Sequence, residues 1–498
     1  MSSALRIDPP GYSLQPFEKR LAELERQLAG DPRQAHRLAF AASVGDHPTH
    51  QYYYDRFVKL TRRAAAHDVA LVELASSVRD GHRAEAHNYL THGIHSYKGK
   101  YFPQIVRSLV NTAGAGVGSL VVDPFAGSGT TTLEAALMGV RGVGVDRNPL
   151  AVLIARTKID ALRLTIDHVR AGELAVIAQL ESGARAELPN LEYLERWFPA
   201  ETLVAITRIL GAIEAATAED AFKDLARLAL STHLRSWSLQ EPSQLRIFRR
   251  SEAPPASALV DRFVVQLAEY ANVVAVGVRL LAELGIRLPD VRLDLADSRE
   301  MGAWGCPPTS VDAVITSPPY ATALPYIDTD RLSIFCLGLA QVQDRSGLEW
   351  EMIGTREILT KQRKELEEAL TRNAAQLPAV VVGQILSIKS ANDKASVGFR
   401  RRNLPALLYR YFIDMRSVLR NAGTALRSGG LCAVVIGDSY TVAGNKKVRI
   451  RTADFLTAIA EEAGLHCIER IPMGGQTAYL PHQRNGIPAE RILLFAKS

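Results

Sequence analysis

The spacing of hydrophobic positions in the first 90 residues predicts amphipathic helices. The segment is rich in Ala, Leu, Glu and Arg, and its apolar side chains recur at helical intervals, as at Phe17, Leu21, Leu24 and Leu28. Residues 1–90 carry no motif that indicates chemistry. We therefore expect an N-terminal helical region there.

From residue 119 the pattern changes to an apolar strand, a glycine-rich turn, a helix and a second strand. The four segments read SLVVD, PFAGSG, TTTLEAALMG and VRGVGVD. This order predicts a βαβ unit. Gly139 lies where the helix should end, because glycine readily adopts the left-handed backbone that closes helices.

Residues 151–290 return to helical spacing, interrupted by prolines, and are too long for a simple crossover between strands. We therefore predict a helical insert there. Short apolar runs typical of buried strands follow at 311–316, 430–437, 467–471 and 490–497. Strands alternating with helices predict an α/β fold, with a mainly parallel sheet formed by residues 91–155 plus 291–498.

Composition narrows the class of protein. With 498 residues, 47% of them hydrophobic and 22% charged, the chain should fold into globular domains. Its four cysteines are single and widely spaced, which fits neither a zinc ribbon nor a disulfide framework. No apolar run reaches the roughly 18 residues that span a bilayer, and the first residues lack the layout of a signal peptide. We expect a protein of the reducing cytoplasm with no membrane partner.

Basic residues outnumber acidic ones by 59 to 53, and the excess is concentrated. Between Lys389 and Arg420 there are eight basic and two acidic residues, and a second cluster without acids extends from Lys446 to Arg451. Such a run forms either a solvated face or a phosphate-binding surface, and charge alone favours neither. The candidates for phosphate contacts are Lys394, Arg400, Arg401, Arg402, Lys446 and Lys447.

The glycine-rich turn after Asp123 carries the first chemical signal. Gly127 and Gly129 let the backbone approach a ligand closely, and the start of the helix offers free N–H groups. The turn is not a Walker loop, since no Gly-Lys-Ser/Thr follows, and it lacks the third glycine of the dinucleotide fingerprint. Asp146 ends the next strand at about the 20-residue spacing that suits ribose hydroxyls, so an adenosine-containing ligand fits.

The second signal is the sequence Thr-Ser-Pro-Pro-Tyr at residues 316–320, directly after a predicted strand. Open α/β sheets bind ligands at the carboxyl ends of their strands. Two successive prolines hold backbone carbonyls rigidly as acceptors, and a ring follows, which suits a planar base with an exocyclic amine. A structural proline-rich loop with a core tyrosine is the alternative.

Together, DPFAGSGTT and TSPPY resemble the amino-methylating DNA methyltransferases, which transfer a methyl group to an exocyclic amine of cytosine or adenine. Further segments similar to that family's motifs are His95 to Pro103, Asp297 to Arg299, Ala323 to Asp328, and the strands at 430–437 and 490–497. The resemblance covers the discontinuous sheet domain. It implies a Rossmann-like, seven-stranded methyltransferase sheet.

The resemblance also assigns roles to residues by position. It implies S-adenosylmethionine as the cofactor, with Asp146 at its ribose, Asp297 at its adenine, and Tyr97 and Lys98 at its methionine end. The residues of the turn that would line the same pocket are Asp123, Phe125, Gly127, Gly129 and Thr130. The loop that would receive a flipped base consists of Ser317, Pro318, Pro319 and Tyr320.

The sequence also favours one target base over the other. The Ser-Pro-Pro-Tyr form is typical of cytosine amino-methylation in the family, whereas its adenine-modifying members usually have Asp or Asn at the position of Ser317. Methylation at C5 of cytosine needs a thiol, generally in a Pro-Cys pair, which this chain lacks. We expect a site-specific DNA methyltransferase acting on N4 of cytosine. Adenine N6 methylation, an RNA base methyltransferase and a DNA-binding protein with a degenerate methyltransferase fold are the alternatives.

The expected partner is double-stranded DNA, together with a cognate nuclease in a restriction-modification or phage-defence system. No metal is expected, because the 12 histidines form no ligand pair with an acidic partner. The expected location is the cytoplasm, in association with the nucleoid through DNA. Target recognition is expected in the 151–290 insert, the 340–420 region or both, with the second favoured for phosphate contacts.

Overall fold

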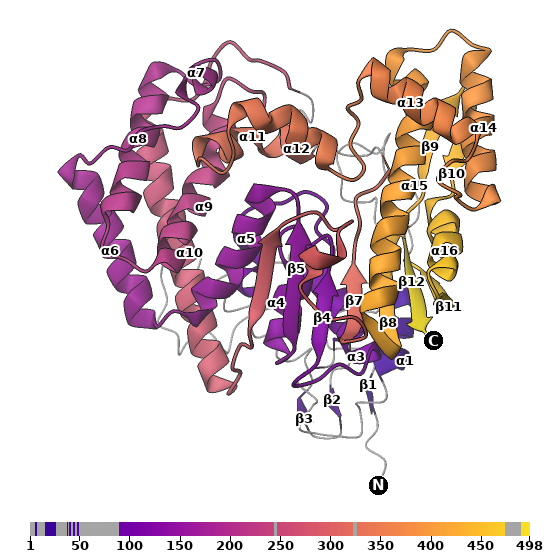
Figure 1. Ribbon diagram of the computed structural model, residues 1–498. Coiled ribbons are helices and arrows are strands. Elements are labelled where there is room, and N and C mark those ends of the chain that lie inside the picture. The colour runs from indigo at the N-terminus through magenta and orange to yellow at the C-terminus, as the bar shows by residue number, and fades with distance from the viewer. Residues whose placement is uncertain are drawn as a thin grey trace.

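A seven-stranded sheet forms the centre of the molecule (Figure 1). The computed structural model describes residues 5–6, 15–25, 37, 39–40, 43–44, 47–48, 89–243, 247–321, 326–473 and 490–498. The strands of the sheet are β4 (Leu120–Asp123), β5 (Arg141–Asp146), β6 (Val291–Leu295), β7 (Val311–Thr316), β8 (Leu426–Gly437), β11 (Leu465–Pro472) and β12 (Glu490–Lys497). The strands expected from the sequence are all present, and β6 is additional to them.

The strands lie in the order β11-β12-β8-β7-β4-β5-β6. The five strands from β8 to β6 are parallel, whereas β12 runs antiparallel to both β8 and β11. Without β12 this is the order of a doubly wound sheet, in which the chain fills one side of β4 and then the other. The structure confirms the expected α/β, Rossmann-like sheet.

Helices cover both faces of the sheet because successive strand residues point to opposite sides. On β4, Val121 packs in a cluster with Ile105, and Val122 packs in a second cluster with Phe412. The covering helices are α3 (Pro103–Thr112), α4 (Thr130–Leu137), α5 (Pro149–Asp160), α15 (Phe399–Ala425) and α16 (Thr452–Glu462). Gly139 has a φ of +74° just beyond α4, so it ends that helix as expected.

The segment between β5 and β6 is helical, as its sequence predicts. Beyond α5 it contains α6 (Ile166–Ser182), α7 (Leu191–Leu194), α8 (Ala200–Ala215), α9 (Asp220–Trp237) and α10 (Ser257–Glu283). These helices share a buried core, which includes Phe222, Leu225 and Phe263 and extends to Ile154 on α5 and to Phe335. Figure 1 shows them on one side of the sheet, opposite α15 and α16. The treatment of residues 151–290 as a separate domain stays a prediction.

Within the described part of the chain, only α10 is long and apolar enough to cross a membrane by length and composition. Its most apolar window has a mean hydropathy of 1.4, and 56% of that window is buried inside the fold. Leu259, Phe263 and Leu267 point into the core of the insert. The apolar character of α10 is thus accounted for by packing, since core helices pass the same test.

A second group of helices lies between β7 and β8. It consists of α11 (Tyr326–Cys336), α12 (Arg345–Glu351), α13 (Thr360–Thr371) and α14 (Ala379–Asp393), followed by α15. After β8 the chain forms an antiparallel hairpin of β9 (Ser439–Ala443) and β10 (Lys446–Ile450). Short 3₁₀ turns are η5 (Leu90–Gly93), η6 (Ala161–Arg163), η7 (Met301–Trp304) and η8 (Val342–Asp344).

Little of the N-terminal region lies within the described residues. Phe17 and Leu21 are buried on α1 (Pro16–Leu24), which packs against α3, so the helical prediction is confirmed for that segment. Leu28 lies outside the described residues. A small sheet of β1 (Leu5–Arg6), β2 (Ser43–Val44) and β3 (His47–Pro48) also lies in this region and was not expected from the sequence. Strands of two residues are too short to show an alternating pattern.

Candidate active site

A cleft of about 580 Å³, including its open mouth, lies beyond the carboxyl ends of β4, β5 and β7. This is the point at which the strand order reverses, and where doubly wound sheets bind ligands. The residues expected from the sequence that line it are Tyr97, Lys98, Phe125, Gly127, Asp146, Asp297, Ser317 and Pro319. The fold therefore brings both motifs into one site.

The glycine-rich turn is shaped by close packing. Gly127 has a φ of +49°, and a Cβ there would lie 3.1 Å from the Tyr97 ring. Gly129, with a φ of +79°, precedes α4, and a Cβ there would lie 2.7 Å from the Cβ of Ala155. Gly129 and the buried Thr130 are not among the residues that line the cleft. Their position indicates a role in packing the turn against α5.

Asp146 ends β5 and lines the cleft. Its Oδ2 accepts from the Gly127 N–H at 2.8 Å, and its Oδ1 accepts from the Asn148 N–H at 2.8 Å. Burial raises the pKa of this carboxyl, while the two backbone hydrogen bonds oppose the shift. Each carboxylate oxygen can accept more than one hydrogen bond, so Asp146 retains acceptor capacity for a ligand hydroxyl.

Asp123 is buried beneath the turn and does not line the cleft. Its carboxylate accepts from Thr131 at 2.5 Å, from Thr316 at 2.6 Å and from the Phe125 N–H at 3.0 Å. Thr316 immediately precedes the Ser-Pro-Pro-Tyr loop. Asp123 therefore ties the glycine-rich turn to the loop, a role that the sequence did not indicate.

Asp123→Asn should remove the dependence of stability on pH that this carboxyl contributes, and leave cofactor affinity unchanged. Burial raises the pKa of Asp123 from 3.8 to about 6. Folding therefore favours the protonated form, and this contribution to stability is lost as the pH rises from 3.8 to about 6. The amide cannot ionise, so the variant should lack this loss. Thermal unfolding at pH 4 and pH 8 measures the change in stability. A large loss of cofactor affinity in the variant would mean that Asp123 contributes to the cofactor pocket.

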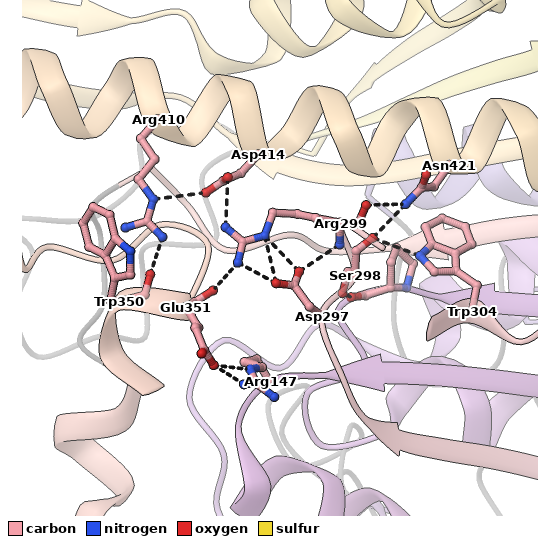
Figure 2. Close-up of polar contacts among 11 residues, drawn as sticks. Arg147, Asp297, Ser298, Arg299, Trp304, Trp350, Glu351, Arg410, Asp414 and Asn421 are labelled. Carbon is pink, nitrogen blue, oxygen red and sulfur yellow. Dashed lines mark hydrogen bonds and ion pairs between the residues drawn. The ribbon is translucent and has the colours of Figure 1, made fainter. Parts of the chain in front are cut away.

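Asp297 belongs to a network that joins the cleft to α15 (Figure 2). Arg299 binds the Asp297 carboxylate through Nε and Nη2, at 2.9 and 2.5 Å, and reaches Asp414 on α15 at 3.0 Å through Nη1. Burial opposes ionisation of Asp297, but Arg299 outweighs it and lowers the pKa of that carboxyl. Asn421, also on α15, donates to the backbone carbonyls of Ser298 and Arg299. Asp297 is thus held ionised and in a fixed place.

Residues at the end of α12 cover one side of the cleft, which we call its roof. This part of the cleft was not predicted from the sequence. Glu351, Met352 and Ile353 line it, and the Glu351 side chain pairs with Arg147 directly after β5. Arg299 donates to the Glu351 carbonyl at 3.2 Å, and Arg410 on α15 donates to the Trp350 carbonyl and stacks on its ring (Figure 2). Cations at a helix C-terminus are favourable, so these arginines stabilise the roof.

The Ser-Pro-Pro-Tyr loop follows β7 and is held at three points. Ser317 Oγ donates to the Val435 carbonyl on β8 at 3.1 Å. Pro319 accepts from the Tyr411 hydroxyl at 2.9 Å, and the Tyr320 hydroxyl donates to Glu490 at 2.5 Å. Ser317 and Pro319 line the cleft, whereas Pro318 and Tyr320 are not among its lining residues. Residues 322–325 lie outside the described part of the chain, and Tyr326 beyond them lines the cleft.

The loop that carries Tyr97 and Lys98 is anchored to the helical insert. The His95 N–H donates to the Tyr270 hydroxyl on α10 at 2.9 Å, and His95 Nε2 lies 2.8 Å from Ser231 Oγ on α9. Burial lowers the pKa of His95 to about 4, so the ring is neutral at pH 7. The insert therefore supports one wall of the cleft.

The two basic clusters of the sequence lie next to each other in the fold. Arg401 donates to the Gly444 carbonyl in the β9–β10 turn at 3.2 Å, and Asn392 on α14 bonds both residues. Lys394, Arg400, Arg402, Lys446 and Lys447 are exposed, and Arg401 is half-buried. A phosphate-binding role for this surface stays a prediction.

The described residues contain no group of three or more His, Cys, Asp or Glu side chains that could hold a metal ion. The four cysteines, all within these residues, are free.

Comparison with known proteins gives matches of very different extent. Residues 96–178 match the UPF0020 family model, described as an RMKL-like methyltransferase domain. The type II methyltransferase M.BsoBI of Geobacillus stearothermophilus is 22% identical over 413 residues, which cover 77% of this chain and 80% of that protein. The type II methyltransferase M.MjaII of Methanocaldococcus jannaschii is 44% identical over 68 residues, which cover 14% of this chain and 13% of that protein.

A tRNA (guanine(10)-N2)-dimethyltransferase of Methanothermobacter thermautotrophicus is 46% identical over 50 residues, which cover 10% of this chain and 15% of that protein. The chain thus matches only a small part of this enzyme and of M.MjaII. The matches identify residues 96–178 as part of a methyltransferase domain that uses S-adenosylmethionine, and they support the amino-methylating group of methyltransferases for this chain.

Proposed function

We propose that the protein is a site-specific DNA methyltransferase that transfers a methyl group from S-adenosylmethionine to the N4 amine of cytosine. The observation that carries this proposal is that Ser317 and Pro319 line the same cleft as Asp146 and Asp297. A loop suited to an exocyclic amine therefore lies beside groups suited to an adenosine. The similarity to type II methyltransferases over most of the chain favours DNA as the substrate and a partner nuclease in a restriction-modification or phage-defence system.

The residues of the cleft fit S-adenosylmethionine. Asp146 offers acceptors for the ribose hydroxyls, and Asp297 offers one for the adenine amine. Met352 and Ile353 give an apolar roof for a planar ring, and Tyr97 and Lys98, which also line the cleft, are proposed to hold the methionine end. When bound, the cofactor supplies an electrophilic methyl group on its sulfonium.

Ser317 is suited to accept a hydrogen bond from the target amine. A hydroxyl has one proton and two lone pairs, and Ser317 Oγ donates its proton to the Val435 carbonyl. Only lone pairs then remain for a ligand in the cleft. With the Pro318 carbonyl as a second acceptor, the amine nitrogen is oriented so that its lone pair forms the bond to the methyl carbon as the bond from that carbon to sulfur breaks. The displaced amine proton leaves to water.

The basic surface is proposed to bind DNA phosphates. Replacing Arg400, Arg401 and Arg402 with Ala should weaken binding to all duplex sequences alike and reduce the slope of log K against log salt by up to about 2.7, or about 0.9 for each phosphate that is no longer neutralised. Titrations at several salt concentrations measure the slope. The control is alanine at Arg196 and Arg227, an exposed and a half-buried arginine of the insert, each paired with an acidic residue three or four positions earlier. A slope equal to that of the wild type would restore the solvated-face interpretation.

RNA methylation is a second candidate, because the tRNA enzyme shares a short segment with this chain. Incubating the purified protein with tritium-labelled S-adenosylmethionine and either unmethylated plasmid DNA or bulk tRNA separates the two. We expect label in DNA and none in tRNA. Label in tRNA alone would overturn the proposed substrate, and leave the fold and cofactor site as described.

A further inference from the structure

Helix α15 touches the catalytic loop through a tyrosine that no sequence motif marks. Tyr411 is almost completely buried, and its hydroxyl donates to the Pro319 carbonyl at 2.9 Å. On the same helix, Arg410, directly before Tyr411, donates to the Trp350 carbonyl of the roof, and Asp414, about one turn later, pairs with Arg299 beside Asp297. The middle of α15 therefore contacts the Ser-Pro-Pro-Tyr loop as well as the roof and the segment that carries Asp297.

A second contact fixes the far end of the loop. The Tyr320 hydroxyl donates to Glu490 Oε1 at 2.5 Å, and Glu490 is the first residue of β12. Burial, and then the Glu490 carboxylate, raise the pKa of Tyr320 well above its ordinary value, so the hydroxyl remains a donor. Gly354 closes the loop from a third side, because a Cβ there would lie 3.1 Å from the Tyr320 carbonyl.

We propose that Tyr411 and Glu490 are positioning residues for methyl transfer, each acting through one residue of the catalytic loop. This inference rests on the proposed role of that loop. Pro319 and Tyr320 are held from α15 and β12, and Ser317 from β8, so the loop that carries the acceptors for the target amine is fixed by three separate elements. A displacement of about 1 Å in a reacting group costs about a hundredfold in rate, so loosening either contact should slow the transfer step.

The chain offers a matched control for Tyr411. Tyr409, two residues earlier on α15, is also buried, and its hydroxyl bonds the Ala369 carbonyl at 3.2 Å and the Ala375 N–H at 2.9 Å, away from the cleft. Tyr411→Phe should lower the single-turnover rate about ten- to a hundredfold, with cofactor and DNA affinities nearly unchanged. Tyr409→Phe should leave the rate near that of the wild type, whatever its effect on melting temperature. Equal rates for the two variants would overturn the role of Tyr411.

Glu490 is tested by the conservative variant. Glu490→Gln keeps an oxygen that can accept from Tyr320 and should retain most of the rate, whereas Glu490→Ala should lose about tenfold. Adding Tyr320→Phe to Glu490→Ala should cost nothing further, because both remove the same bond. A Gln variant as slow as the Ala variant, or additive losses, would contradict positioning through Tyr320.

Rates are measured on the nucleic acid that the wild type labels with tritium. Label in RNA in place of DNA would therefore count against the proposed substrate only. The ratios among the variants still decide the roles of Tyr411 and Glu490.

Discussion

Ser317→Ala is expected to lower the single-turnover rate of methyl transfer about a hundredfold, because it removes an acceptor that orients the amine as the methyl group moves. Cofactor affinity should stay nearly intact, since the Ser317 hydroxyl already bonds Val435 and the carboxylates of the cofactor site are untouched. The measurement is quenched single-turnover transfer with saturating enzyme and cofactor. Ser310→Ala is the matched control, because Ser310 also donates to a backbone carbonyl but precedes β7. Full activity of Ser317→Ala would mean that the loop is not the active site.

Tyr320→Ala tests capture of the flipped base separately from the methyl-transfer step. If its ring stacks on a flipped base, truncation should cost roughly 1–3 kcal/mol in capture as well as rate. A mismatched target base, already partly unstacked, should restore part of the binding lost by Tyr320→Ala and none of the rate lost by Ser317→Ala. Because Tyr320 also bonds Glu490, Tyr320→Phe isolates the hydroxyl from the ring. Restored transfer by Ser317→Ala on the mismatched duplex would contradict this division of roles.

Asp146→Ala should weaken S-adenosylmethionine binding about ten- to a hundredfold, a loss of roughly 1.5–3 kcal/mol. The substitution removes the proposed acceptor for the ribose and also releases the Gly127 N–H, which loosens the glycine-rich turn. Isothermal titration calorimetry without added metal measures the change. Asp294→Ala on neighbouring β6 is the control, because that carboxylate pairs with Arg292 and does not line the cleft. An unchanged affinity for Asp146→Ala would refute the ribose assignment.

The sheet was predictable because parallel strands buried on both faces give short continuous apolar runs, such as VDAVIT at β7. β6 was harder to recognise, because its sequence VRLDL places two charged residues among three apolar ones and its central residue alone is buried. The β9–β10 hairpin was also missed. Its Gly444–Asn445 turn is a known hairpin signal. The strand that follows, KKVRI, carries three basic residues and therefore lacks the apolar character of the other strands.

Only some of the residues that line the cleft could be predicted from the sequence. Asp146 ends a predicted strand and Ser317 follows one, whereas Asp297 was indicated only by the family resemblance. The roof comes from Glu351 to Ile353, which enter the site through the packing of α12 on α15 and follow no local pattern. Long-range partners such as Arg299 with Asp414, and Tyr411 with Pro319, depend on how distant elements meet.

The most direct test of the account is mass spectrometry of nucleosides from unmethylated plasmid DNA incubated with the purified protein and S-adenosylmethionine carrying a deuterated methyl group. We expect labelled N4-methylcytosine with the wild-type protein and a large loss of it with Ser317→Ala, which excludes a contaminating enzyme. Labelled N6-methyladenine would contradict the base assignment, and no labelled nucleoside of either kind would contradict DNA methylation itself.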